Sequence, residues 1–206
     1  MILELFLKGG PVMWPLLLLS IASLSVVIER VVFLFQERRR RDHECVARIL
    51  EFLERGDAEK AAAAGSGSDD FVARILTHAL RHRGRSFTNA FLQASSRELK
   101  RFDRGLVVLD TAITLGPLLG LLGTVVGMIT SFQLVGDQEL TGPSVITGGI
   151  AEALVATATG LSVAIIALIP FNYLNSRVES ARHEIEDAGN QAEILLANGD
   201  GPKTGA

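Results

Sequence analysis

The sequence predicts an all-α, polytopic membrane protein with three transmembrane helices, two of them extended into a cytoplasmic helical bundle. The chain has 206 residues, of which 48% are hydrophobic, and its mean hydropathy is +0.33. The apolar residues gather in three long runs with at most one charge each, and about 20 such residues suffice for a helix to cross a bilayer. The positive charge lies elsewhere, because 15 of the 20 Lys and Arg residues fall between positions 36 and 105.

The first apolar run predicts a transmembrane helix over residues 11–35, preceded by an N-terminal periplasmic segment over residues 1–10. No charged residue occurs from position 9 to position 28, and Trp14 is typical of a membrane interface. The run is too long, and its flank too weakly basic, for a cleaved signal peptide. The four arginines 38–41 follow it as a stop-transfer pattern.

Two further spans are predicted over residues 106–135 and 145–173, joined by a periplasmic turn over residues 136–144. No charge lies between Asp110 and Asp137, and Glu152 is the one charge between Glu139 and Arg177. Because arginine-rich loops stay on the inner side of a membrane, residues 36–105 are expected in the cytoplasm. We therefore expect a multi-pass membrane protein whose N-terminus faces outward and whose C-terminus lies in the cytoplasm.

Residues 36–105 predict several short helices, each beginning after a capping side chain. The expected N-caps are Asp42, Asp57, either Asp69 or Asp70, and Ser86. No breaker separates the helix that starts after Ser86 from the second span, which predicts one continuous helix over residues 86–135. The C-terminal helix over residues 174–198 carries a heptad seam that needs a partner helix, and residues 199–206 read as a disordered tail. The seam consists of Val178, Ala181, Ile185, Ala188, Ala192 and Leu195.

Glu152 is the main candidate functional residue, because a charge inside hydrocarbon costs about 2.5–3.5 kcal/mol. Small residues surround it and permit other helices to approach closely. Proton passage through a low-dielectric interior needs a group that can be both charged and neutral, and a carboxyl is such a group. The small residues around Glu152 are Gly148, Gly149, Ala151, Ala153, Ala156, Ala158 and Gly160.

Hydroxyl side chains could order water beside this carboxylate. Thr159 follows Glu152 by seven residues and shares its side of the helix, whereas Thr157 lies about 140° away from it. On the second span, four glycines form a helix-packing face: Gly116, Gly120, Gly123 and Gly127. The secondary pore-lining candidates, in addition to Thr159, are Asp110, Thr114 and Ser131. Each of these residues also has an alternative interpretation. Thr124 and Thr157 could be structural hydroxyls that bond to the backbone of their own helix. Glu152 could be a structural group hydrogen-bonded between helices, or a group near enough to the outer face to stay hydrated.

Other chemistry is not expected. His78 and His82 are spaced as a metal pair on a helix, but without a third ligand nearby they read as surface histidines, and we expect no metal site. The single Cys45 excludes an internal disulfide. No pair of catalytic side chains is placed within the spans, so neither an enzyme nor an intramembrane protease is expected.

The spans resemble the ExbB/TolQ/MotA proton-channel family. The motifs are GPLLGLLGTVVGMITSF over residues 116–132 and GGIAEALVATATGLSVAIIALIPFNYL over residues 148–174, and GGPVMWPLLLLSIASLSVVIER over residues 9–30 is similar to the first span of the ExbB and TolQ branch. Three spans rather than four disfavour the flagellar MotA type, and PLLGLLGTVVG is more similar to ExbB than to TolQ.

The resemblance implies a multi-pass protein of the bacterial inner membrane, with a periplasmic N-terminus and a cytoplasmic C-terminus. It also implies a ring, expected to be a homopentamer, around single-span ExbD- or TolR-like partners, with a TonB- or TolA-like energy transducer. It implies proton-pathway roles for Glu152, Thr124 and Thr157, with protons as the coupling ion, no other cofactor and no nucleic acid. The expected function is a stator subunit that uses the proton-motive force to energise outer-membrane transport. A TolQ-like role in envelope maintenance, and a passive scaffold whose partner carries the proton chemistry, stay open.

Overall fold

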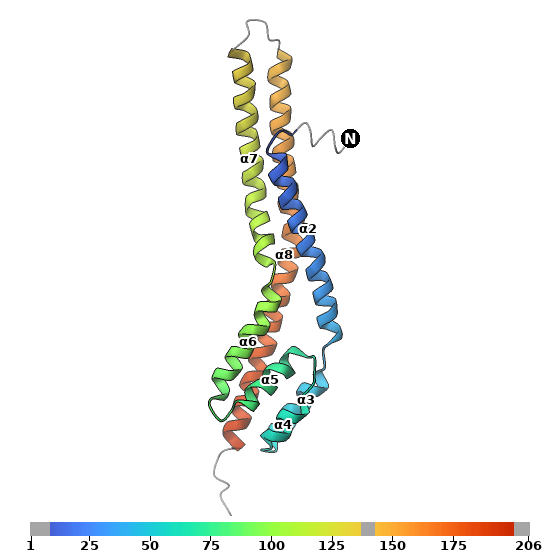
Figure 1. Ribbon diagram of the computed structural model, residues 1–206, viewed down its shortest axis with the longest axis vertical. Helices are drawn as coiled ribbons and strands as arrows, with labels where there is room; N and C mark the ends of the chain where they lie inside the picture. The colour runs from blue at the N-terminus through green and yellow to red at the C-terminus, as the bar shows by residue number, and fades with distance from the viewer. Residues whose placement is uncertain (1–8, 137–142, 200–206) are drawn as a thin grey trace, which may run out of the picture. The chain divides into compact units, whose positions relative to one another are not determined.

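The computed structural model describes residues 9–136 and 143–199, and within these ranges every regular element is a helix (Figure 1). The expectations for residues 1–8, 137–142 and 200–206, which include most of the N-terminal segment, the turn and the tail, lie outside the described residues. The helices are α2 (Met13–Arg39), α3 (His43–Glu54), α4 (Ala58–Ala64), α5 (Phe71–Arg81), α6 (Phe87–Asp103), α7 (Leu106–Gly136) and α8 (Pro143–Gly199).

Three of these helices, α2, α7 and α8, are long and apolar enough to cross a membrane. The predicted all-α class with three spans is therefore confirmed. The chain divides into two compact units, which we describe separately. Of the described residues, the span unit contains 9–30, 105–136 and 143–174, and the polar unit contains 31–104 and 175–199.

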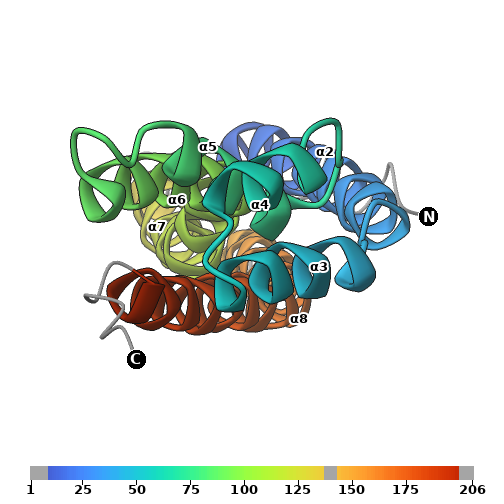
Figure 2. The same cartoon turned by 90° about the horizontal axis from the view of Figure 1, so that it is seen from below.

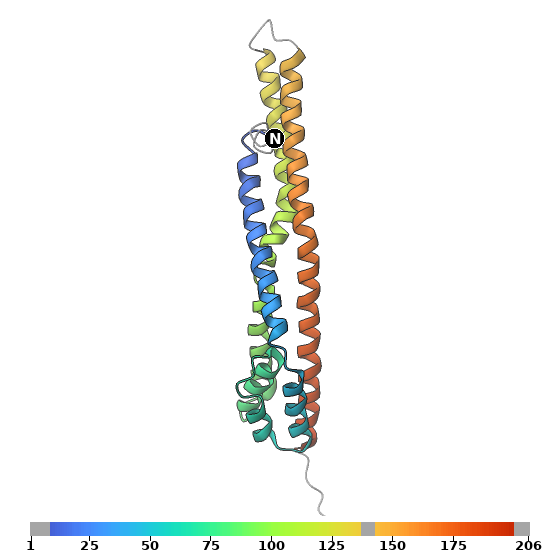
Figure 3. The same cartoon turned by 90° about the vertical axis from the view of Figure 1, so that its right-hand side faces the viewer.

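In the span unit, α7 and the first part of α8 run side by side (Figures 1 and 3). Both helices expose large apolar side chains, such as Leu118 and Phe132 on α7 and Leu154 and Ile169 on α8, which are 58%, 69%, 62% and 71% exposed. Outward-facing apolar side chains of this size suit contact with lipid or with neighbouring helices.

In the polar unit, α3, α4 and α5 pack against one another, and α5 also packs on α6 (Figure 2). Each of these helices begins at a predicted cap, because the side chains of Asp42, Asp57, Asp70 and Ser86 all accept hydrogen bonds from backbone N–H groups of the first turn. The starts of these four helices were thus correctly predicted from local chemistry.

The heptad seam on the C-terminal part of α8 is buried from Val178 to Ala192. Its partner includes α6, because the ring of Phe91 lies where a Cβ on Gly189 would be, and Thr88 donates a 2.9 Å hydrogen bond to Glu193. The expectation that this seam needs a partner helix is confirmed.

The predicted continuous helix over residues 86–135 is wrong. The backbone ends α6 at Asp103, adopts an extended ψ of 131° at Arg104, and takes a φ of +82° at Gly105 before α7 begins. A positive φ is costly for residues other than glycine, and Gly105 therefore permits the break between α6 and α7. The two helices that continue from the span unit into the polar unit are α2 and α8.

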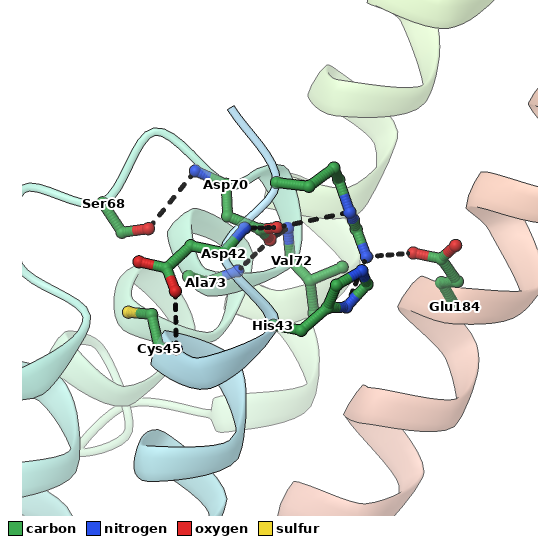
Figure 4. A network of polar contacts seen from close by, with 9 residues as sticks. Asp42, His43, Cys45, Ser68, Asp70, Val72, Ala73 and Glu184 are labelled. Carbon is green, nitrogen blue, oxygen red and sulfur yellow. Dashed lines mark hydrogen bonds and ion pairs between the residues drawn. The ribbon is translucent and has the colours of Figure 1, made fainter. Parts of the chain in front are cut away.

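Asp70 is a completely buried carboxylate at the start of α5 (Figure 4). Its Oδ1 accepts hydrogen bonds of 2.8 and 3.1 Å from the backbone N–H groups of Val72 and Ala73, and its Oδ2 accepts one of 3.0 Å from that of Asp42. Asp70 therefore caps α5 and also holds the residue that caps α3.

Arg41 supplies the positive charge beside this carboxylate. Its Nε lies 3.5 Å from Asp70, its NH2 group lies 2.6 Å from a carboxylate oxygen of Glu184, and its guanidinium stacks over the Phe71 ring at 4.5 Å. Arg41 thus connects α5 with α8 inside the polar unit. This junction was not predicted from the sequence.

Candidate proton pathway

Glu152 lies on α8 in the span unit and is half-buried. Its carboxylate occupies the space that a Cβ on Gly10 would fill. Gly10 has a φ of +72°, and its carbonyl accepts a 3.2 Å hydrogen bond from the N–H of Met13 in the first turn of α2. The turn that starts α2 therefore forms one wall of the Glu152 site. Only a glycine at position 10 leaves room for the Glu152 carboxylate.

The predicted glycine face of α7 lies directly against α8. A Cβ on Gly120 would be 3.0 Å from the Cα of Thr157, and one on Gly127 would be 3.1 Å from the Cβ of Ala153. In the same way, Gly116 lies close to Gly160, and Gly123 lies close to Ala156. Backbones that approach this closely gain van der Waals contact, which drives helix association in lipid.

Thr157 is the hydroxyl that crosses this helix pair. Its Oγ1 donates a 2.9 Å hydrogen bond to the backbone carbonyl of Gly120 on α7. The bond is possible because Gly120 has no side chain to separate the two backbones. Thr157 therefore joins α7 to α8 within one protomer.

The other predicted hydroxyls bond to their own helices. Thr124 donates to the carbonyl of Leu121 at 2.7 Å, and Thr159 to that of Val155 at 2.8 Å. The remaining hydroxyl candidates are Ser131, which is buried and donates to Gly127, and Thr114, which is exposed and donates to Asp110 and Thr111. Such bonds satisfy the hydroxyl locally and leave its oxygen able to accept a further bond.

The structure brings some of the predicted residues together and separates others. Thr157 and the glycine face meet at the α7–α8 contact, whereas Glu152 lies against the turn before α2. Asp110 is exposed near the start of α7. Among the residues that the structure describes, no hydrogen bond joins Glu152 to Thr124 or Thr157. Gly10 is the site residue that sequence reasoning missed, although its position in a Gly-Gly-Pro turn is a signal for a special backbone conformation.

The histidines at 78 and 82 are neighbours on α5, with ring centroids 4.4 Å apart. Within the described ranges, no group of three side chains is placed to hold a metal ion.

Replacing Thr157 with valine is expected to weaken the α7–α8 contact by about 0.5–1.5 kcal/mol, the net worth of a typical hydrogen bond. Valine keeps the shape of threonine but leaves the Gly120 carbonyl without this donor. Thr159→Val is the matched control on the same helix, because its bond stays within α8. Unfolding of both variants in detergent measures the difference, and equal stability of the two would contradict a special role for Thr157.

The helices and the site define a class, a multi-pass helical membrane protein with a carboxylate within its spans. The model of the MotA/TolQ/ExbB proton channel family matches residues 64–187, more than half of the chain. The biopolymer transport protein ExbB-like 1 of Synechocystis is 34% identical over 200 residues, which cover 94% of this chain and 78% of that protein.

Proteins named biopolymer transport protein ExbB are also similar. The one from Neisseria meningitidis serogroup A is 27% identical over 94% of this chain and 96% of its own length. The one from Salmonella typhimurium is 28% identical over 90% of this chain and 79% of its own length. The chain belongs to the MotA/TolQ/ExbB proton channel family and is most like ExbB. It is a multi-pass protein of the inner membrane.

Proposed function

We propose that the chain is the proton-channel stator subunit of an inner-membrane motor that energises outer-membrane transport. The observation that carries this proposal is the half-buried carboxylate of Glu152 within a span unit whose helices expose apolar side chains. A carboxylate kept there at a cost of several kcal/mol is expected to serve ion passage. The names of the ExbB relatives support transport as the purpose.

The proposed assembly is a homopentamer in the lipid bilayer around an ExbD-like single-span partner, which passes work to a TonB-like transducer. Protons are the coupling ion. The exposed apolar side chains on α7 and α8 give each protomer surfaces for such neighbours. The 15 Lys and Arg residues between positions 36 and 105 support a cytoplasmic location for that segment and for the C-terminus, with the N-terminus in the periplasm.

The test is proton uptake into vesicles that hold the chain together with its single-span partner. A pH gradient and a membrane potential are imposed, and each 100 mV supplies about 2.3 kcal/mol per charge to drive proton entry. Proton entry is expected only when both proteins are present. Vesicles with the full complex that stay as proton-tight as protein-free vesicles would reject a channel function.

One observation favours a passive scaffold as the second candidate. Thr124 and Thr157 both donate to backbone carbonyls, as purely structural hydroxyls do. A double Thr124→Ala, Thr157→Ala variant distinguishes the two functions. A channel subunit is expected to assemble with its partner and lose proton uptake, whereas a scaffold would lose assembly or nothing, as native mass spectrometry and vesicle assays can show.

Gly10→Ala is expected to lower proton uptake by disturbing the Glu152 carboxylate. The new Cβ would claim the position of that carboxylate, and the left-handed backbone adds about 1–2 kcal/mol of strain. Gly56→Ala is the matched control, because Gly56 has a similar φ of +73° with open space around its Cβ position. If both variants retain equal uptake, the wall at Gly10 has no part in the pathway.

A further inference from the structure

The four arginines 38–41, at and just after the end of α2, divide into two groups. Arg41 is held by Asp70, Glu184 and the Phe71 ring. Arg38, Arg39 and Arg40 are exposed, and no acidic side chain of the described residues forms an ion pair with them. Arg41 is thus structural, whereas the first three present their charge outward.

The end of α2 combines this charge with an exposed apolar surface. Val31, Val32 and Phe35 are 59%, 51% and 62% exposed. At 3.6 residues per turn, Arg38 and Arg39 lie within about 60° of Phe35 around the helix axis. The guanidinium of Arg39 stacks over the Phe35 ring at 5.0 Å. One stripe of α2 therefore runs from apolar side chains directly into a pair of arginines.

We propose that this stripe, Val31, Val32, Phe35, Arg38 and Arg39, is a binding surface for an anionic phospholipid. The apolar side chains suit the acyl chains, and two guanidinium groups suit a headgroup with net negative charge, because arginine binds phosphate through paired N–H donors. Arginine can also lay its aliphatic stem on apolar surface while its charge stays at the membrane–water boundary. A zwitterionic headgroup carries its own ammonium group and gains less from the same pair.

The test compares phosphatidylglycerol with phosphatidylcholine of identical acyl chains on the delipidated full chain, by native mass spectrometry. The wild type is expected to prefer phosphatidylglycerol. The double variant Arg38→Gln, Arg39→Gln is expected to lower the ratio of the two affinities by up to about 30-fold, or about fivefold for each arginine. The double variant Arg83→Gln, Arg85→Gln is the control, because it removes the same charge from exposed positions between α5 and α6.

A wild-type ratio near one, or an equal loss in the control pair, would overturn the proposal. Displacement of the lipid by millimolar inorganic phosphate would also overturn it, because the site would then recognise the free anion. A second measurement needs no variant. Phosphatidylglycerol with a photoreactive headgroup is expected to label the wild type around Arg38 and Arg39, and labelling confined to other segments would contradict the site.

Discussion

Replacing Glu152 with glutamine is expected to abolish proton-driven work by the assembled complex. Glutamine keeps the size and hydrogen-bonding capacity of the side chain but cannot exchange a proton. Removal of a proton-transfer group typically costs 10²- to 10⁴-fold, so proton uptake is expected to fall by about 100-fold or more. Assembly should survive, because the close packing of α7 on α8 involves the glycine face and Thr157.

Glu179→Gln provides the matched control for this experiment. Glu179 lies on α8 too, but its side chain is 56% exposed in the polar unit. It should leave proton uptake unchanged. Proton uptake and complex formation are measured on both variants in the same vesicles. Full coupled activity in the Glu152 variant would remove that carboxylate from the pathway, and loss of the complex would make its role structural.

The predictions that succeeded depend on neighbours in sequence. Asp42, Asp57 and Ser86 cap helices because a short polar side chain bonds the N–H groups that follow it. The same local logic separates the three apolar spans from the arginine-rich segment. It also placed Gly116, Gly120, Gly123 and Gly127 on one face of α7, from which the sequence predicted helix packing.

The break at Gly105 was missed for a local reason. Residues on both sides of it favour helix, and a single glycine inside such a pattern is often tolerated. Only the backbone angles of Arg104 and Gly105 show that the helix ends and restarts. The consequence is that α7 begins afresh beside α2, where a Cβ on Gly105 would meet the side chain of Val26.

The remaining surprises depend on residues far apart in sequence. Nothing near Glu152 in the sequence indicates that Gly10 lies against it. Thr157 and Thr159 have the same side chain on the same helix, yet one bonds across to α7 and the other to its own backbone. Periodicity places such residues on a face, but tertiary packing decides their partners.

Asp70→Ala is expected to destabilise the chain by about 3–5 kcal/mol, the size typical of removing one partner from a buried ion pair. The variant leaves three backbone N–H groups, those of Asp42, Val72 and Ala73, without their acceptor. It also leaves Arg41 with less negative charge beside it. Asp70→Asn should cost less, because an amide oxygen can still accept part of these bonds.

Asp57→Ala is the control that distinguishes the contribution of the Asp70 junction from that of an ordinary helix cap. Asp57 also caps a helix, bonding the N–H of Lys60 at 3.0 Å, but no second helix depends on it, and its loss should cost about 1 kcal/mol. Chemical unfolding of the full chain in detergent measures both variants. A cost at Asp70 no greater than that at Asp57 would mean that the buried contacts with Asp42 and Arg41 contribute little. A larger cost means that one carboxylate sets the relative positions of α3 and α5, and through Arg41 and Glu184 their attachment to α8.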